Sequence, residues 1–461
     1  MSSTGLPIAV IGAGPVGLAA AAHLLQCGFR PIVFEAGPGV GHAVRQWRHV
    51  RMFSPWRYNI DTASRAFLDE AGWSQPAPDH HPTGAEILRD YLEPLAAVPA
   101  IRDAIIFNAR VVAVGRRGFD KVRSAGRDAA PFVITVEHAD GRRSTYEAQA
   151  VIDASGTYLA PNPAGSGGLP AIGELEAAPN IFYGIPDVLG IERPRYAGRR
   201  VLVVGSGHSA MNALLDLCAL QGQEPATTIH WALRRADTSA VYGGGAADQL
   251  PARGELGQRA RAVVERGQAQ VAAPFRILEI VRTGEGLRVT GQADTGAREI
   301  LVDEIVVATG FRPDLSFLRE IRLALDPALE SAAALGPLID PNIHSCGTVR
   351  PHGFAELAHP EKDFYIVGMK SYGRAPTFLL ATGYEQVRSV VAALAGDFES
   401  ARRIVLDLPE TGVCSAPTLA GQSADAGCCG TPAVEKASAA AISCCSPSVK
   451  PRVAVSGGCC R

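Results

Sequence analysis

The sequence of 461 residues lacks several features that mark specialised classes of protein. No apolar run approaches the roughly 18 residues of a membrane span. The first residues, Met1–Pro7, have no charged region typical of a signal peptide, so we expect a cytoplasmic protein. A net charge of −2 leaves no excess of basic residues for nucleic acid or an anionic membrane as partner. The length allows two or three domains.

Cysteine is scarce through most of the chain, and no two cysteines have the C-x-x-C spacing. The missing spacing argues against a redox-active dithiol. A chain of this length is also a poor match to a small disulfide scaffold. Of the ten cysteines, seven follow Pro409. What the chain has in abundance is glycine, and two glycine clusters follow short apolar segments.

The first glycine cluster follows the apolar segment Ile8–Ile11, which predicts a buried parallel strand. Its pattern is G-x-G-x-x-G, in which missing side chains let backbone amides approach a pyrophosphate and let the next helix press against the strand. The residues predicted to contact the dinucleotide are Gly12, Gly14, Pro15 and Gly17. The helix that follows should end at Gly28.

An acidic residue ends the next apolar segment and indicates which dinucleotide binds here. The strand predicted over residues 32–34 delivers Glu35 at 23 positions past Gly12. A carboxylate about 20 residues after the glycine turn meets the adenosine ribose hydroxyls. Because a carboxylate would repel a 2′-phosphate, this turn predicts FAD or NAD rather than NADP. Ala36 is expected to line the same site.

The segment His42–Asp61 is dense in arginine and tryptophan and has neither helical nor strand periodicity. It predicts a long loop over the first βαβ unit, and loops of this length often carry function. The side chains expected against a cofactor ring or substrate are Arg45, Trp47, Ser54, Trp56 and Asn59. We take Trp47, Ser54 and Asn59 as candidate catalytic residues and Arg45 and Trp47 as cofactor contacts. The alternative is surface packing by amphipathic side chains.

The second glycine cluster follows the apolar segment Val201–Val204. It reads Gly205, Ser206, Gly207, His208, Ser209, Ala210, a permitted G-x-G-x-x-A variant. The next predicted strand ends in Arg234 and Arg235 instead of an acid. Two guanidinium groups suit a 2′-phosphate, so this unit should prefer NADPH over NADH. The alternative is two solvated surface arginines. Gly205, Gly207, His208, Ser209, Arg234 and Arg235 are the predicted contacts.

Small residues end three further predicted strands, as expected where a cofactor comes close. They are Gly156 after residues 150–153, Thr309 and Gly310 within the segment Glu299–Asp314, and Gly368 after residues 364–367. A long helix should begin near Pro376, so that Thr377 and the helix N-terminus face the flavin. We therefore divide the chain into an FAD-binding domain (1–161 and 311–400), an inserted NADPH-binding domain (162–310) and a tail (409–461).

The order of these parts resembles the two-dinucleotide-binding-domain flavoproteins. Within them, the segment ATGFRPD and the Trp/Arg loop are most similar to the class B flavin-containing monooxygenases over about residues 6–396. The resemblance implies FAD on the first glycine cluster, NADPH on the second, and oxygenation of a soft nucleophile by molecular oxygen. The sequence departs from this family at the family's F-x-G-x-x-x-H-x-x-x-[YF] motif. Here Phe182 and Gly184 are followed by Val188 and Glu192 at the histidine and aromatic positions.

The C-terminal tail combines a lack of aromatic residues with three adjacent cysteine pairs. From Pro409 onward there is no Phe, Tyr or Trp, so we expect disorder. Adjacent cysteines do not have the spacing of a tetrahedral zinc site. We expect them to bind a soft ion such as trivalent arsenic, mercury or copper(I). The predicted ligands are Cys428, Cys429, Cys444, Cys445, Cys459 and Cys460. The combination looks like arsenic-resistance flavoproteins.

The sequence thus predicts an α/β fold with two Rossmann-like, doubly wound domains, the NADPH domain inserted into the FAD domain. The function expected is NADPH- and FAD-dependent oxidation of a soft substrate, such as a trivalent arsenical, a sulfide or an amine. One alternative is a metal, metalloid or thiol reductase fed by the tail cysteines, with Cys346 as the thiol beside the flavin. A second is a metal-sequestering flavoprotein without turnover. The oligomeric state, a homodimer included, stays open.

Overall fold

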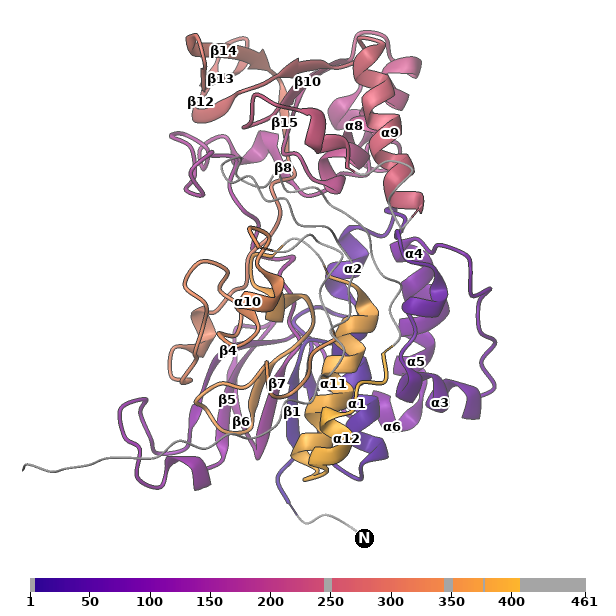
Figure 1. The fold of residues 1–461 in the computed structure, drawn as a ribbon, viewed down its shortest axis with the longest axis vertical. Helices are drawn as coiled ribbons and strands as arrows, with labels where there is room; N and C mark the ends of the chain where they lie inside the picture. The colour runs from indigo at the N-terminus through magenta and orange to yellow at the C-terminus, as the bar shows by residue number, and fades with distance from the viewer. Residues whose placement is uncertain (1–4, 244–250, 344–350, 376–377, 407–461) are drawn as a thin grey trace, which may run out of the picture. The chain divides into compact units, whose positions relative to one another are not determined.

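The computed structural model describes residues 5–243, 251–343, 351–375 and 378–406. Its core contains two parallel five-stranded sheets, each with an antiparallel three-stranded sheet beside it. Figure 1 shows how these elements follow one another along the chain. The α/β fold with Rossmann-like parallel sheets predicted from the sequence is confirmed.

The first parallel sheet has the strand order β16-β7-β1-β2-β3. Its strands are β1 (Ile8–Ile11), β2 (Pro31–Phe34), β3 (Ile105–Ile106), β7 (Ala150–Asp153) and β16 (Phe364–Ile366). Every residue of β1 and β7 is buried. This explains why both read as continuous apolar runs rather than as alternating ones. Strand β16 comes from far along the sequence and pairs with β7.

Different layers cover the two faces of this sheet (Figure 1). On one face α1 (Pro15–Gln26) packs against α11 (Leu380–Leu394) and α3 (Thr62–Glu70). On the other face lies the meander of β4 (Ala109–Arg116), β5 (Phe132–His138) and β6 (Arg143–Ala148). Two apolar clusters, one on each side, therefore hold the carboxyl ends of β1, β7 and β16 in place.

The second parallel sheet repeats this plan with the order β11-β10-β9-β15-β8. Its strands are β8 (Ile181–Tyr183), β9 (Arg200–Val204), β10 (Thr228–Ala232), β11 (Gln270–Ala272) and β15 (Glu304–Val307). Helices α8 (His208–Gln223) and α9 (Pro251–Glu265) pack on one side. The antiparallel strands β12 (Arg276–Thr283), β13 (Gly286–Ala293) and β14 (Gly296–Val302) pack on the other.

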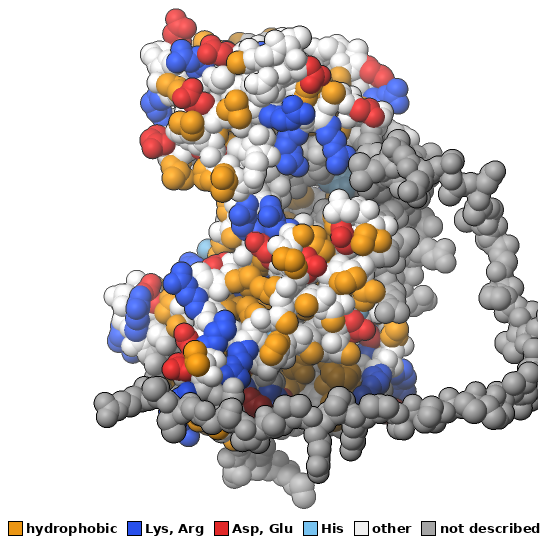
Figure 2. All heavy atoms as spheres, turned by 60° about the vertical axis from the view of Figure 1, so that its left-hand side comes forward, with side chains coloured by type: hydrophobic (Ala, Val, Ile, Leu, Met, Phe, Trp, Pro, Cys, Tyr) orange, Lys and Arg blue, Asp and Glu red, His pale blue; other side chains and the backbone are white. Residues whose placement is uncertain are grey.

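Short helices complete the described part of the chain. They are α2 (His42–Gln46), α4 (Gly84–Ile87), α5 (Glu93–Ala97), α6 (Pro99–Arg102), α7 (Arg193–Tyr196), α10 (Gly336–Ile339) and α12 (Phe398–Arg402). Among the described residues, none of the helices has the length and apolar character needed to cross a membrane. On the face shown in Figure 2, basic and acidic side chains are interspersed, in line with the small net charge.

Two local expectations are corrected. The segment His42–Asp61 is not a continuous loop, because α2 and a 3-10 turn at Trp56–Tyr58 interrupt it. The helix expected from about Pro376 begins at Leu380, with Leu379 extended as its N-cap. Both differences arise because tertiary packing decides short segments that have no clear periodicity of their own.

Candidate functional site: two glycine turns at sheet edges

The first glycine turn leaves no room for side chains on the protein side. Gly12 has φ +96°, and a Cβ there would lie 2.9 Å from the Ala154 carbonyl oxygen. A Cβ on Gly17 would lie 1.9 Å from the Gly12 carbonyl oxygen. Gly14 differs, because a Cβ there would meet no atom within 4 Å. The open side of the turn is thus at Gly14, where a dinucleotide pyrophosphate would approach.

Helix α1 starts directly after this turn, with Pro15 in its first turn and no side chain capping its N-terminus. Uncapped N–H groups at a helix start form an anion site. Glu35 is buried at the end of β2, and its carboxylate accepts hydrogen bonds from the N–H groups of Ala13 (2.8 Å) and Gly37 (2.9 Å). Ala36 beside it is half-buried. The open cradle, the uncapped helix and the acid together fit an ADP-ribosyl group such as that of FAD.

The carboxyl ends of β7 and β16 contribute a charged pair that the sequence reading missed. Lys370 follows β16, and its Nζ lies 2.7 Å from Asp153 Oδ2 at the end of β7. Gly156 and Gly368 flank the pair with φ values of +70°. The available signal was an Asp and a Lys, each at or near the end of a short apolar strand. Sequence alone could not show that these strands are neighbours.

The candidate catalytic residues of the segment 42–61 mostly make contacts within the protein. Asn59 is fully buried, and its amide nitrogen donates to the carbonyl oxygens of Ser54 and Pro55. The Ser54 hydroxyl in turn donates to Asn59 Oδ1 at 2.9 Å. These hydrogen bonds fix the shape of the segment. A role for Ser54 or Asn59 at the flavin therefore stays a proposal.

The aromatic and basic residues of the same segment lie in three environments. Trp56 is buried in the main apolar cluster. Trp47 is half-buried, and its ring lies so close to Gly84 that a Cβ there would be 2.8 Å away. Arg45 is exposed and pairs with Glu93 at 2.8 Å. Trp47 and Arg45 retain accessible surface for a ligand, whereas Trp56 is a core residue.

The second glycine turn has the same construction as the first. Gly205 has φ +128°, and a Cβ there would lie 2.4 Å from the Ala308 carbonyl oxygen. A Cβ on Gly207 would meet nothing within 4 Å, so this turn is also open on one side. Helix α8 begins at His208 with no side-chain cap. Ser209 follows in its first turn and is half-buried.

Strand β10 leads into Arg234 and Arg235, and both side chains are exposed. Arg234 Nη1 donates to the Ser166 carbonyl oxygen at 3.3 Å. Accessible guanidinium groups beyond the strand that follows a glycine turn fit a 2′-phosphate.

Thr309 and Gly310 follow β15 and contact the chain at Asn162. The Thr309 hydroxyl donates to the Asn162 carbonyl oxygen at 2.9 Å. These two residues thereby hold the edge beside Gly205.

An aromatic contact links the segment 42–61 to the second turn. The ring centroids of Phe53 and His208 are 5.3 Å apart, and Phe53 packs against the apolar cluster around α8. The segment 42–61 therefore touches the start of the helix at the second turn. Sequence reading did not single out Phe53, because an isolated phenylalanine gives no local signal.

The cysteines predicted to take part in function fall in parts of the chain that the structure does not describe. They are Cys346 and all six paired cysteines of the tail, and the predicted cofactor contact Thr377 is outside the described residues as well. The two described cysteines, Cys27 and Cys218, are free. Burial raises the pKa of the Cys218 thiol to about 11, and burial with nearby Asp397 also raises the pKa of Cys27. Within the described residues, no cluster of His, Cys, Asp and Glu could hold a metal.

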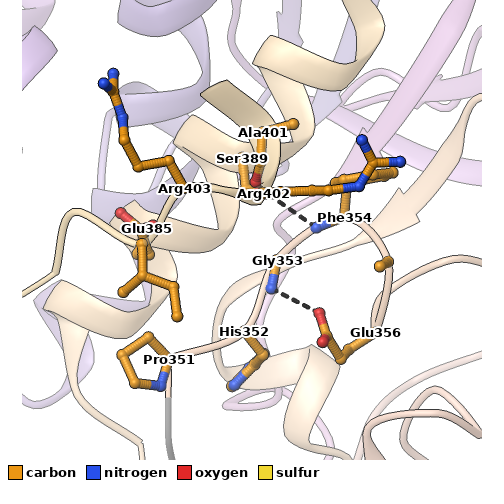
Figure 3. Close-up of a pocket in the computed structure, with 12 residues that line it drawn as sticks. Pro351, His352, Gly353, Phe354, Glu356, Glu385, Ser389, Ala401, Arg402 and Arg403 are labelled. Atoms are coloured by element: carbon orange, nitrogen blue, oxygen red, sulfur yellow. Dashed lines mark hydrogen bonds between the residues drawn. The ribbon is translucent and has the colours of Figure 1, made fainter. Parts of the chain in front are cut away.

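A small cavity of about 110 Å³ lies beside α11 and α12. The residues that line it are far from both glycine turns in the sequence. Figure 3 shows its walls, where Gly353 N–H donates to Glu356 and Phe354 N–H donates to the Ser389 hydroxyl. Glu385 in its wall is already paired with Arg388. None of the residues predicted for the cofactor sites lines this cavity.

Comparison with known proteins agrees with this geometry. A model for the pyridine nucleotide-disulphide oxidoreductase family matches residues 9–333, which contain both glycine turns. The chain belongs to this family. Members use FAD and NAD(P)H, and the chain is an oxidoreductase of this type. The prediction of FAD and a nicotinamide cofactor is thereby confirmed.

Relatives in sequence bear monooxygenase names. The flavin-containing monooxygenase ustF1 of Aspergillus flavus is 26% identical over 223 residues, covering 46% of this chain and 50% of that protein. The putative flavin-containing monooxygenase 2 of Arabidopsis thaliana is 27% identical over 252 residues, covering 49% and 51%. The match thus spans about half the length of each relative.

Solved structures share the fold at low sequence identity. The bacillithiol disulfide reductase Bdr (YpdA) of Bacillus cereus has a TM-score of 0.61 at 20% identity, covering 85% of this chain and 99% of that one. The ornithine hydroxylase PvdA of Pseudomonas aeruginosa has a TM-score of 0.57 at 14% identity, with the same coverage. The family's fold therefore carries both disulfide reductases and hydroxylases, and the fold alone does not choose between them.

Proposed function

We propose that the chain is a flavin monooxygenase that takes hydride from NADPH and oxidises a soft nucleophilic substrate with molecular oxygen. The observation that carries this proposal is a pair of open glycine turns in a sequence that has no C-x-x-C. Electrons delivered to a flavin then lack a C-x-x-C dithiol to receive them, and oxygen is the natural acceptor. The relatives named as flavin-containing monooxygenases also favour a monooxygenase.

In this proposal FAD, when bound, supplies the redox chemistry, and the protein supplies binding, orientation and exclusion of water. The first turn and the N-terminus of α1 would hold the FAD pyrophosphate, and Glu35 the adenosine ribose. Gly207, Ser209 and the N-terminus of α8 would hold the pyrophosphate of NADPH. The segment containing Trp47 would cover the flavin and limit access of water.

We further propose that the substrate is a thiophilic trivalent centre, with an arsenical as the first candidate. The support is chemical: three adjacent cysteine pairs in the tail offer soft thiolates without the spacing of a tetrahedral zinc site, and such thiolates bind soft ions. Detoxification of arsenicals, in which the tail collects the ion and the flavin site oxidises it, would join both halves of the chain. A sulfide or an amine would also suit an oxygenating flavin, and both belong in the same assay.

Oxygen dependence tests the proposed function. NADPH oxidation and oxygen uptake should both rise when a trivalent arsenical, a sulfide or an amine is added in air, with one oxygenated product per NADPH. Turnover of the same substrates that persists without oxygen would instead identify a reductase. The described cysteines, both with raised pKa, are poor redox thiols, so a reductase would need Cys346.

A tail without its paired cysteines separates collection of the substrate from its oxidation. A variant with all six paired tail cysteines changed to serine should keep its FAD content and its kcat, but show a higher KM for the arsenical at low concentration. A Cys218→Ser variant is the matched control, since that thiol is buried. Full loss of turnover in the tail variant would favour the reductase, and binding without any turnover in the wild type would favour a sequestering protein.

The two arginines beyond β10 should set the preference for NADPH. The double variant R234A/R235A loses charge-assisted hydrogen bonds worth roughly 1.5 to 3 kcal/mol, so the preference over NADH should fall by about 10- to 150-fold. The ratio of kcat/KM for the two cofactors measures it. Arg298→Ala, an exposed arginine on β14 of the same unit, is the control. An unchanged ratio in the double variant would return both arginines to the solvated surface.

A further inference from the structure

A fully buried ion pair lies where the cofactor edge of the first sheet begins. The side chains of Lys370 and Asp153 have no exposed surface, and their nearest N–O distance is 2.7 Å. The Phe317 ring covers the ammonium at 4.3 Å. Taking two charges out of water is costly, and apolar residues of the same volume often give equal or greater stability. Stability alone is therefore a weak reason for this pair.

The pair holds the hydroxyl of one neighbouring residue, Ser155, by hydrogen bonds to both of its charged groups. Ser155 Oγ lies 2.6 Å from Asp153 Oδ1 and 3.1 Å from Lys370 Nζ. A carboxylate only accepts and an ammonium only donates, so the hydroxyl must give its proton to Asp153 and accept one from Lys370. The Ser155 N–H is held by the same Asp153 oxygen at 3.0 Å. One lone pair remains, and toward a ligand Ser155 is an acceptor only.

This acceptor lies beside the first glycine turn. Ser155 itself is exposed, and a Cβ on Gly12 would lie 3.1 Å from its Cα atom. Dinucleotides bind along this edge of a parallel sheet. A pyrophosphate offers only acceptors and would find no proton at Ser155. The ribityl chain and the ribose of FAD offer hydroxyl groups that can donate.

We propose that Lys370 is a positioning residue of the FAD site, which together with Asp153 fixes the Ser155 hydroxyl as the acceptor for a hydroxyl group of FAD. The inference rests on the FAD site of the proposed function. It adds the buried Lys370–Asp153 pair to this site, whereas the glycine pattern consists of residues without charge. It also explains the location of the pair, since both strands end at the cofactor edge.

Binding of FAD to the full-length apoprotein tests the inference without any turnover. Ser155→Ala should raise the Kd of FAD by roughly tenfold, the effect of one lost hydrogen bond. Lys370→Met should also raise the Kd, because the Asp153 carboxylate and the Ser155 hydroxyl lose the ammonium that holds them in place. Lys370→Met leaves Asp153 buried without its partner and can lower stability. The double variant D153N/K370M removes both charges and should recover the melting temperature while its Kd for FAD stays raised. Recovery of a wild-type Kd in this double variant would show the pair to be structural only and overturn the inference.

Two FAD analogues identify the donor hydroxyl. One lacks the 2′-hydroxyl of the ribityl chain and the other lacks the 2′-hydroxyl of the adenosine ribose. The wild type should lose about tenfold in affinity for one of them, and Ser155→Ala should lose nothing further for that same analogue. Equal losses in wild type and Ser155→Ala for both analogues would contradict the assignment. If the wild type binds no FAD, the proposed function fails first.

Discussion

Replacing Gly14 with alanine is expected to abolish tight FAD binding in a protein that stays folded. Gly14 has an extended backbone that any residue can adopt, and an added Cβ would meet no protein atom within 4 Å. The methyl group would instead stand where the pyrophosphate must approach the turn. Overpacking there should raise the Kd for FAD on the order of 100-fold, equivalent to about 2.7 kcal/mol. Titration of the apoprotein with FAD, together with its melting temperature, measures both effects.

Two other glycines are the matched controls for this prediction. Gly17→Ala places a Cβ 1.9 Å from the Gly12 carbonyl oxygen, so this variant should lose stability as well as FAD. Gly222→Ala, on α8 where a Cβ meets nothing within 4 Å, should change neither FAD affinity nor the fold. A Gly14→Ala protein that binds FAD with wild-type affinity would place the dinucleotide elsewhere.

Of the substitutions considered, removing the carboxylate of Glu361 should lower the free energy of unfolding most. Glu361 is buried, and it pairs at 2.8 Å with both Arg116 and Arg127, whose side chains are also buried. Arg116 additionally lies 3.6 Å above the Phe132 ring. Glu361→Ala leaves two guanidinium groups inside without their partner, which should cost about 3 to 5 kcal/mol. Chemical unfolding of the purified protein measures the loss.

An exposed ion pair of the same meander is the control. Glu137 pairs with Arg143 at 2.8 Å; the Arg143 side chain is exposed to solvent and that of Glu137 is partly exposed. Glu137→Ala should therefore change stability by less than about 1 kcal/mol. Equal, small losses of stability in both variants would contradict the prediction that the buried ion pairs of Glu361 with Arg116 and Arg127 stabilise the fold.

The same carboxylate predicts a direction for the effect of pH. Burial raises the pKa of Glu361, but hydrogen bonds from Arg127 and Arg116 outweigh it and hold the pKa below its ordinary 4.5. The stability that it contributes is present above pH 4.5 and is lost as the pH falls through the lower, folded-state value. Burial also lowers the pKa of His359 from 6.5 to about 4, so unfolding takes up a proton between these values. The free energy of unfolding of the wild type should thus fall steadily as the pH is lowered below 6.5.

Local patterns were sufficient to predict the sheets and turns. Apolar runs such as Ile8–Ile11 and Val201–Val204 are buried on both faces, so their sequence carries the strand signal directly. Gly12 and Gly205 adopt positive φ and pack against backbone, a requirement that only glycine meets without strain. These constraints act within a few residues of chain, which is why reading the sequence recovers them.

Long-range contacts were beyond such reading. Lys370 and Asp153 are 217 residues apart, and Glu361 meets Arg116 across 245 residues. Nothing within either strand indicates that its neighbour in the sheet carries the opposite charge. The polar segment 42–61 is ambiguous for another reason: Ser54 and Asn59 look like site residues, and in the structure they bond to each other and shape the turn. Hydrogen-bonding capacity in a sequence does not tell which partner uses it.

The central claim is that NADPH reduces an FAD held at the first glycine turn, and anaerobic mixing tests it most directly. The purified, FAD-loaded chain should lose its yellow flavin absorbance when NADPH is added without oxygen, faster than with NADH, and regain it when air enters. A colourless protein that cannot be loaded with FAD, or a bound flavin that NADPH leaves oxidised, would contradict the account.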